Sequence, residues 1–238
     1  MAEDQETLTA LQDRLFEAVL TNVPFDGWSQ AAIDAAAASS GMEPGDAYRC
    51  FPGGPLDAMA HFSDWADRMM LAAIEEAGAA YDDLKIREKI AFGVRTRLTL
   101  LESHKEAVRM MSGIMARPQH VTKASRLVWK TVDAMWYAAG DTATDFNHYT
   151  KRGLLAGVQT STVLFWLADR SDEHERTWAF LDRRIANVLA IGMRIGKVTK
   201  MGARMPDPSK MAKWTSVFRN VRPGAKTSND DEPGPTVH

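Results

Sequence analysis

The sequence predicts an all-α fold, and two regularities support this class. Apolar residues recur at steps of three and four in one segment after another, as Leu8, Leu11, Leu15 and Val19 do in the first. This spacing places them on one face of a helix. Residues that cap or break helices separate these segments, and no segment alternates apolar and polar residues as a half-buried strand does. The 238 residues are enough to bury a sizeable hydrophobic core.

The first three expected helices lie within the first fifty residues or so. The first ends near Asn22 and Pro24. Ser29 is a favourable N-cap for an alanine-rich helix through Ser39, and Pro44 suits the first turn of a short helix that reaches Phe51. A helix followed by two short helices, with a glycine-containing turn between them, is the outline of a helix-turn-helix.

Six further helices are expected after the FPGGP sequence. Their approximate positions are 56–76, from residue 84 onward, 105–115, 119–138, 145–168 and from residue 171 onward. Ser171 is a favourable cap for the last of these helices, because the acidic residues that follow it lie near the positive end of the helix dipole. The buried stripe of that helix is expected to consist of Trp178, Leu181, Ile185 and Val188.

The composition excludes several classes of protein. Hydrophobic residues make up 45% of the chain and charged residues 25%, as in an ordinary soluble globular protein. The single cysteine, Cys50, excludes an intramolecular disulfide framework and a cysteine-rich zinc site. The longest uncharged run, residues 153–168, is shorter than the roughly twenty apolar residues that span a bilayer. The polar, acidic beginning of the sequence resembles neither a signal peptide nor a transit peptide.

Charge is distributed unevenly along the chain. Residues 1–65 contain eleven acidic and two basic residues, a net charge of −9, whereas residues 84–130 contain eleven basic and three acidic residues, a net charge of +8. Affinity for DNA depends on Lys and Arg side chains that neutralise phosphates, and the helix that would read the DNA, Glu43 to Phe51, offers only Arg49. The helix-turn-helix outline is therefore predicted to be a scaffold that does not bind nucleic acid.

A second basic region lies near the end of the chain. Gly202 and Pro206 indicate a linker, and Ser209 then caps a short helical segment with bulky apolar residues on one face and Lys and Arg around the other. The segment is either an amphipathic helix that binds an anionic membrane surface or a terminal helix packed on the core. The expected membrane-binding residues are Lys210, Met211, Lys213, Trp214, Phe218, Arg219 and Val221.

Motifs for catalysis are largely missing from the sequence. It contains no glycine-rich phosphate loop, no HExxH, no GxSxG and no Glu-x-x-His pairs of a di-iron bundle. Asp141, Asp145 and His148 recur at spacings of four and three, which would place them on one face of a helix. This trio could ligate a metal ion in an enzyme, contact a partner or cap a helix corner. Because no second group of ligands accompanies it, no metal, cofactor or catalytic residue is predicted.

The stretch around this trio resembles a known family. The sequence DAMWYAAGDTATDFNHYTKRGLLAG, residues 133–157, contains the blocks AGD, TDFN and YTKR in that order. It closely resembles the signature of the Coq-nine family of ubiquinone-biosynthesis accessory proteins, and the resemblance extends from about Leu15 to Gly196. It implies a helical fold like that of the TetR regulators, a homodimer formed through the last two core helices, and binding of isoprenoid lipids in place of DNA.

The resemblance also implies a role and a partner. Family members are accessory proteins without catalytic activity that present ubiquinone intermediates to the demethoxyubiquinone hydroxylase, a separate di-iron enzyme. The hydroxylase-docking patch of the family maps onto Met135, Trp136, Asp145 and His148. This sequence departs from eukaryotic members at His148, where they commonly carry Trp, and at Ala138, where they carry Tyr.

Apolar residues of the central helices could line a lipid cavity or fill an ordinary core. The methionines among them favour an interior that adapts to a flexible tail. The residues expected to contact lipid are Phe62, Trp65, Met69, Phe92, Met110, Met111, Met115, Trp129, Phe165 and Trp166.

Four regions are expected in the chain: a helix-turn-helix-like part (1–52), a lipid-binding and dimerisation part (53–198), a linker with the amphipathic helix (199–222) and a disordered tail (223–238). Eukaryotic members of the family bear an import presequence. Because none is recognised here, the expected location is the cytoplasm of a bacterium, peripheral on its inner membrane. The main hypothesis is a lipid-binding accessory factor of ubiquinone biosynthesis, and the alternative is a ligand-responsive, DNA-binding repressor of the TetR type.

Overall fold

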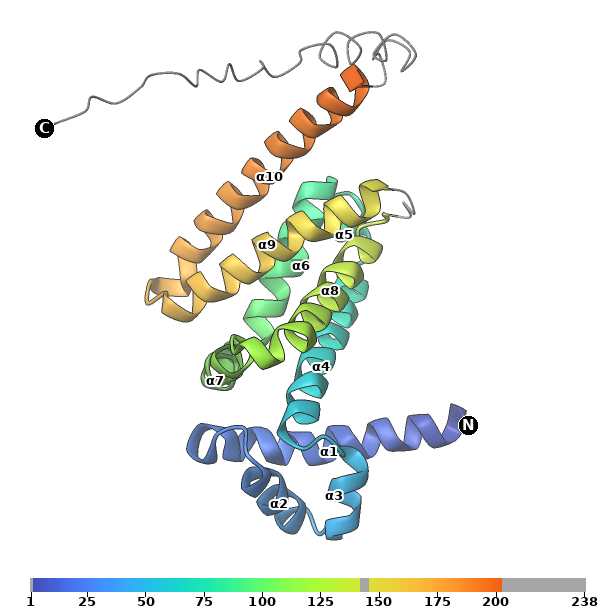
Figure 1. Ribbon diagram of the computed structural model, residues 1–238, viewed down its shortest axis with the longest axis vertical. Coiled ribbons are helices and arrows are strands. Elements are labelled where there is room, and N and C mark those ends of the chain that lie inside the picture. Colours follow the sequence, from blue (N-terminus) through green and yellow to red (C-terminus); the bar gives the residue numbers. More distant parts are fainter. Residues whose placement is uncertain (1, 142–145, 203–238) are drawn as a thin grey trace, which may run out of the picture. The chain divides into compact units, whose positions relative to one another are not determined.

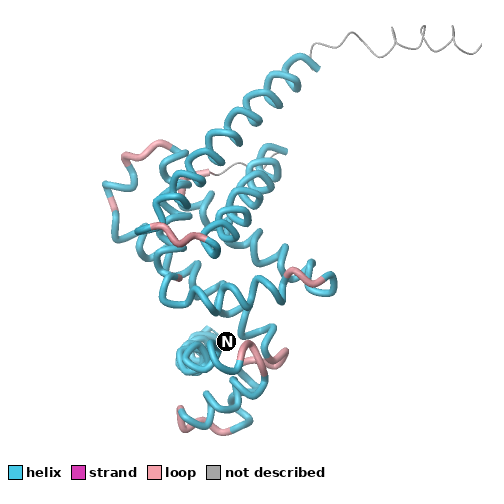
Figure 2. Tube along the Cα trace, turned by 90° about the vertical axis from the view of Figure 1, so that its left-hand side faces the viewer, coloured by secondary structure: helices cyan, strands magenta, loops and turns pink. Residues whose placement is uncertain are grey.

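The computed structural model describes residues 2–141 and 146–202, and within these ranges all regular secondary structure is helical (Figure 1). Figure 2 shows the same helices joined by short loops. The all-α class predicted from the sequence is confirmed. The helices are α1 (Ala2–Asp26), α2 (Gln30–Ser39), α3 (Pro44–Cys50), α4 (Pro55–Ala77), α5 (Ala79–Asp82), α6 (Ile86–Leu100), α7 (Lys105–Met115), α8 (Val121–Ala138), α9 (Phe146–Ala168) and α10 (Glu175–Gly202).

The chain divides into two compact units, Met1–Gly192 and Met193–His238. All contacts described below lie within the first unit. In the second unit the described residues are 193–202, which complete α10. No helix in the described ranges is both long enough and apolar enough to cross a membrane.

The first three helices form the N-terminal part of the first unit, and α4 leads from them to the remaining helices (Figure 1). α1 packs along α2 and buries a stripe of residues at helical spacing, namely Leu15, Phe16, Val19 and Val23. Ser29 caps α2 as predicted, because its hydroxyl oxygen accepts a hydrogen bond from the backbone N–H of Ala32 at 3.1 Å. Gly41 then turns the chain toward α3 with a φ of 64°, a conformation that glycine adopts readily.

Two details of the helices differ from the prediction. α1 does not stop at Pro24 but continues through it to Asp26, just beyond the predicted end. Gly27 follows it with a φ of 66°, and its N–H bonds to the carbonyl of Val23 at 2.9 Å. The stop is therefore a glycine in the left-handed region rather than the proline. The short α5 is a second difference, because no apolar periodicity indicates a helix of one turn.

An aromatic cluster joins the N-terminal helices to α4. The ring of Phe62 in α4 lies with its centroid 5.6 Å from that of Phe16 in α1 and 5.6 Å from that of Trp28. The indole N–H of Trp28 also donates to the backbone carbonyl of Ala107 in α7, at 3.0 Å. Beyond this joint, α4 packs against both α6 and α8, and α8 packs along α9. α4 is thus shared by the N-terminal part and the bundle.

Asp169 organises the connection between α9 and α10. Its carboxylate accepts hydrogen bonds from the backbone N–H and the hydroxyl of Thr177 at 3.0 and 2.6 Å, and from the backbone N–H of Ser171 at 2.9 Å. The predicted cap, Ser171, plays a smaller part, because its hydroxyl accepts one bond from the backbone N–H of Arg176. Of the predicted stripe on α10, Leu181 and Ile185 are buried, and Trp178 and Val188 are half-buried.

Candidate functional site

A cavity of about 290 Å³ lies between α4, α6, α7, α8 and α9. Its walls form because each helix turns one apolar face inward. The lining residues of α7 are spaced three and four apart along the helix, as are those of α8 and of α9, which is the period of one helical face. The larger apolar side chains that line it are Phe62, Leu101, Met111, Met115, Leu127 and Leu164.

A buried polar network borders the cavity. The guanidinium of Arg97 in α6 donates from Nε to the carboxylate of Asp67 in α4 at 2.7 Å, and from Nη2 to the hydroxyl of Ser63 at 3.2 Å. The hydroxyl of Thr131 in α8 donates to the same carboxylate at 2.9 Å. Ser63, Arg97 and Thr131 line the cavity. The network pairs a positive with a negative group, so it adds polarity without net charge.

Burial governs the ionisation of this network. Asp67 is only 5% exposed. Burial raises the pKa of the Asp67 carboxyl, and the Arg97 charge and the hydrogen bonds from Arg97 and Thr131 oppose that rise without cancelling it. Burial thus favours the neutral form of this carboxyl, and its partners favour the ionised form.

Gln159 of α9 contributes a different kind of polar group to the cavity. Its side chain lines the cavity and is 3% exposed. Its amide oxygen Oε1 is fully buried and has no hydrogen-bond partner among the described residues. One sequence signal could have drawn attention to it, because Gln159 interrupts the uncharged apolar run of residues 153–168.

The cavity reaches the surface along α9. Thr160 and Leu164, one helical turn apart, both line the cavity and are both exposed, Leu164 to 57%. Trp136 does not line the cavity. Ala116, at the end of α7, is also exposed and lines the cavity, so among the described residues the opening lies between the C-terminal half of α9 and the end of α7.

Three of the residues expected to contact lipid line this cavity, namely Phe62, Met111 and Met115. The other seven do not. Trp65 stacks on Phe62, Phe92 packs against Tyr81, and Phe165 stacks on Phe180. Trp166 is fully buried and donates its indole N–H to Glu102. Met110 is half-buried against the core, Met69 is 40% exposed and Trp129 is 37% exposed.

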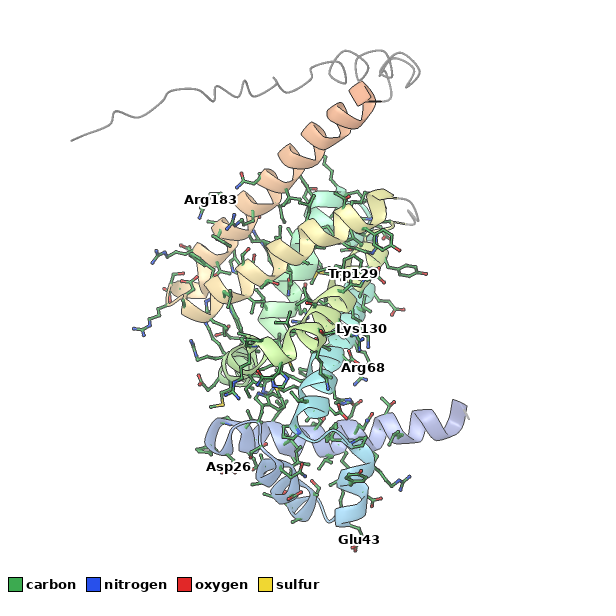
Figure 3. All side chains as sticks on the ribbon, in the orientation of Figure 1. Asp26, Glu43, Arg68, Trp129, Lys130 and Arg183 are labelled. Atoms are coloured by element: carbon green, nitrogen blue, oxygen red, sulfur yellow. The ribbon has the colours of Figure 1, made fainter. Side chains whose placement is uncertain are left out.

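Trp129 belongs to a separate, open groove on the surface of α8. Its ring centroid lies 6.1 Å from that of Tyr149 in α9, and Arg126 and Lys130 border the same groove. Figure 3 labels Trp129 and Lys130 on α8. Helical periodicity alone did not distinguish this outer face of α8 from the face that lines the cavity.

The residues of the expected docking patch lie in different environments. Met135 is 1% exposed and faces the core, where it lies near Gly93 of α6. Trp136 is half-buried, donates its indole N–H to the carbonyl of Lys151 at 3.3 Å and lies under the Lys151 ammonium. Asp145 and the side chain of His148 lie outside the described residues, so the structure does not describe the full patch.

Of two other groups of predicted residues, one can be placed in part and the other lies outside the described residues. Asp141 of the possible metal-binding trio accepts hydrogen bonds from Lys151 at 2.8 Å and from Arg152 at 3.4 Å. These two contacts are with cationic side chains. The seven residues expected to bind membrane, from Lys210 to Val221, all lie outside the described ranges.

Comparison with known proteins establishes the family. The model of the COQ9 family matches residues 121–192. A protein of Xenopus laevis, named ubiquinone biosynthesis protein COQ9-B, mitochondrial, is 31% identical over 214 residues, covering 84% of this chain and 70% of the relative. The chain belongs to the COQ9 family. The ubiquinone biosynthesis protein COQ9, mitochondrial, of Rattus norvegicus is 32% identical over 206 residues, and the chain spans 65% of the length of that relative.

A solved structure shows the same fold as this COQ9-family chain. It is the TetR transcriptional regulator from Nitrosomonas europaea, which aligns with a TM-score of 0.62 and 20% sequence identity over 76% of this chain and 98% of the regulator. The TetR-like fold implied by the resemblance is therefore confirmed. At this level of identity the likeness concerns the fold alone.

The expected location is contradicted by the same comparisons. The chain was expected in the cytoplasm of a bacterium, peripheral on the inner membrane. The matched COQ9 relatives are eukaryotic, from rat and Xenopus among others, and they are named as mitochondrial proteins. The expectation rested on recognising no import presequence in the sequence, and the names of the relatives overturn it.

Proposed function

We propose that this protein is a non-enzymatic accessory factor of ubiquinone biosynthesis that binds an isoprenoid ubiquinone intermediate in the α4–α9 cavity. The observation that carries the proposal is an apolar cavity bordered by a small number of fixed polar groups, the usual composition of a small-molecule site. Membership of the COQ9 family supplies the pathway, since its curated relatives are named ubiquinone biosynthesis proteins.

The size of the cavity bears on how such a lipid would lie. A volume of about 290 Å³ is at the lower end of the range for small-molecule sites, roughly 300 to 1,000 Å³. The cavity therefore suits a ring and the first part of a tail. The remainder of a long isoprenoid tail would leave through the opening beside Thr160 and Leu164.

Lipid extraction from purified protein tests this proposal. The full chain would be purified in the presence of quinone-rich membranes and its bound lipids identified by native mass spectrometry. Thr160→Trp places an indole at the opening and is expected to reduce the amount of bound isoprenoid lipid several-fold. Thr122→Trp is the matched control, because Thr122 is an exposed residue of α8 that does not line the cavity. A wild-type protein that stays lipid-free would contradict the proposal.

Presentation of the lipid to the demethoxyubiquinone hydroxylase is the second part of the proposal. It is supported by the family signature around Trp136. Trp136→Ala is expected to weaken co-purification with that hydroxylase, whereas Trp129→Ala, which changes an exposed indole outside the signature, is expected to leave it intact. Equal co-purification of both variants with the hydroxylase would count against this docking site.

Binding to an anionic membrane surface is the third part. It rests on the sequence of residues 209–222, with basic and bulky apolar residues on opposite faces. Deleting residues 209–222 is expected to reduce sedimentation with liposomes that contain anionic lipid, more strongly at low salt than at high salt. Unchanged sedimentation would contradict membrane binding by this segment and would leave the proposed lipid binding in the cavity untouched.

A homodimer is the fourth part of the proposal. Gly153 and Gly157 on α9 are exposed, and a Cβ atom added to either would meet no other group within 4 Å. Small residues one turn apart allow close helix approach. Sedimentation velocity is expected to give the mass of a dimer, and a monomer at high protein concentration would contradict it.

A further inference from the structure

The unpaired amide of Gln159 is the most unusual polar group in the cavity. A buried amide oxygen without a partner loses its hydrogen bonds to water and gains none in the fold, which costs free energy. Such groups are rare in folded proteins and need an explanation. Gln159 is only 3% exposed and lines the cavity. A bound ligand is therefore the natural partner for its Oε1.

Arg97 and Thr131, two other polar residues that line the cavity, differ from Gln159 because they already have partners within the fold. Arg97 donates to Asp67 and Ser63, and the hydroxyl proton of Thr131 is directed to Asp67. The charge of Arg97 is balanced by Asp67 at 2.7 Å. A ligand with a phosphate or carboxylate would therefore meet no unbalanced positive charge in this network, and burying its own charge there would be unfavourable.

What Oε1 of Gln159 lacks is a hydrogen-bond donor. An amide oxygen only accepts hydrogen bonds, so it is satisfied by a hydroxyl group and not by a carbonyl oxygen. A hydroquinone or phenol ring carries such hydroxyls, whereas the oxidised quinone carries two carbonyl oxygens in their place. The two forms have almost the same size and tail, and they differ at the atom that would face Gln159.

We propose that Gln159 makes the cavity selective for an uncharged ring that carries a hydroxyl group, so that the protein binds the reduced, hydroquinone or phenol form of its lipid in preference to the quinone. This inference rests on the proposed function, because it takes an isoprenoid lipid with an aromatic or quinonoid head as the occupant. Arg97, Thr131 and Ser63 then act as a neutral polar wall around the same head.

Paired binding measurements on the full chain test the inference. The probes are a decyl-tailed ubiquinol, kept reduced without oxygen, and the corresponding decyl-tailed ubiquinone. The wild-type protein is expected to bind the ubiquinol roughly tenfold more tightly, as one additional hydrogen bond to a buried acceptor implies. Gln159→Leu keeps the size of the side chain and removes the acceptor, so it is expected to bind the two forms with nearly equal affinity.

A ligand-free measurement provides a second readout. Gln159→Leu removes an unpaired buried polar group, so thermal unfolding of the variant is expected at the same temperature as the wild type or higher. Thr162→Val is the matched control on α9: Thr162 is fully buried but does not line the cavity, and its hydroxyl donates to the carbonyl of Val158 at 2.7 Å. This control is expected to keep the preference for ubiquinol.

The outcomes separate the two proposals. Equal binding of both forms by the wild type, or a preference that survives in Gln159→Leu, would overturn the selectivity and leave the lipid-binding function standing. Failure of the wild type to bind either form would overturn the lipid-binding function and the selectivity together. A lower unfolding temperature for ligand-free Gln159→Leu would show that the amide is satisfied within the fold and would also overturn the inference.

Discussion

At the scale of single residues, the buried ion pair between Asp67 and Arg97 links helices of the bundle. The Asp67 carboxylate is 7% exposed at its side chain and the Arg97 guanidinium 10%. Together with Thr131 the pair connects three helices, α4, α6 and α8. A buried pair of this kind stabilises little in comparison with apolar packing, but it is costly to break from one side.

Asp67→Asn is therefore expected to destabilise the protein strongly. The substitution leaves the guanidinium of Arg97 buried without a counter-charge, which costs about 3–5 kcal/mol of unfolding free energy in comparable cases. Urea unfolding followed by circular dichroism measures the loss. The double variant Asp67→Leu with Arg97→Met removes both charges. Its loss of unfolding free energy is expected to be smaller than the summed losses of the single variants Asp67→Leu and Arg97→Met. Additive losses would contradict the coupling.

His61 is a second residue whose ionisation is set by the fold. It is 8% exposed, its Nε2 lies 2.6 Å from Oδ1 of Asp13, and its ring packs against Phe16 and Phe51. Burial lowers the pKa of His61, and the hydrogen bond to Asp13 opposes this without reversing it. Burial also lowers the pKa of His104. Both rings are thus easier to protonate in the unfolded chain than in the folded protein.

The stability of the protein is therefore expected to fall as the pH falls below about 6.5, the pKa of an unperturbed histidine. In that range the unfolded state binds more protons than the folded state, so the free energy of unfolding decreases toward lower pH. Urea unfolding at a series of pH values between 7.5 and 5.5 measures the slope. His61→Phe is expected to make the dependence of unfolding free energy on pH shallower. The pH dependence that remains in this variant is expected to come from His104. An identical slope in the variant would show that His61 does not contribute.

At the scale of elements, local signals located most helix ends correctly. Ser29 and Pro44 mark the starts of α2 and α3 because capping and the fixed φ of proline act within a few residues. The start of α10 was less predictable. Ser171 matches the usual N-cap pattern, but the carboxylate of Asp169, which precedes it in the connection, accepts most of the hydrogen bonds there. A cap assembled across eight residues depends on how the loop folds back, which no local pattern encodes.

Asp169→Ala is expected to weaken the α9–α10 connection. The substitution removes the acceptor for Thr177 and Ser171, and the loss of a helix cap costs about 1–2 kcal/mol. Burial raises the pKa of Asp169, but its hydrogen bonds from Thr177 and Ser171 outweigh burial and hold the pKa below its usual range. The stabilisation is thus complete above about pH 4 and is lost as the pH falls further. Chemical unfolding of the wild type and of Asp169→Ala measures the effect. The difference between their unfolding free energies should be smaller near pH 3 than at pH 7. Ser171→Ala, the control, should cost less.

At the scale of the molecule, the TetR-like fold is that of a DNA-binding regulator, whereas the charge of the N-terminal helices opposes DNA binding. The fold aligns with a transcription regulator, yet residues 1–65 carry a net charge of −9. On α3, the guanidinium of Arg49 lies 3.1 Å from Asp46, so part of its charge is already neutralised. Phosphates of a duplex would meet an acidic surface here, which opposes the electrostatic part of DNA binding.

The protein is accordingly expected not to bind duplex DNA. A gel-shift titration with random-sequence duplex at low salt measures this. The charge-reversed variant Glu43→Lys with Asp46→Lys serves as a positive control, because it frees Arg49 and adds two cations to α3. A wild-type complex that forms at about 50 mM salt and dissociates at about 200 mM, the behaviour of phosphate-contacting proteins, would favour the repressor alternative instead.

The all-helical class, the order of the helices and the family could be read from the amino-acid sequence. These properties depend on periodicity, capping residues and a contiguous signature, each of which acts over a few neighbouring positions.

The cavity depended on tertiary structure. Met111 lines it and Met110 does not; Leu127 lines it and Trp129 lies on the outer face. Periodicity groups the residues of one helix into faces, but which face meets a void is decided by how five helices pack together. The same holds for Gln159, whose polarity is visible in the sequence and whose missing partner is visible only in the fold.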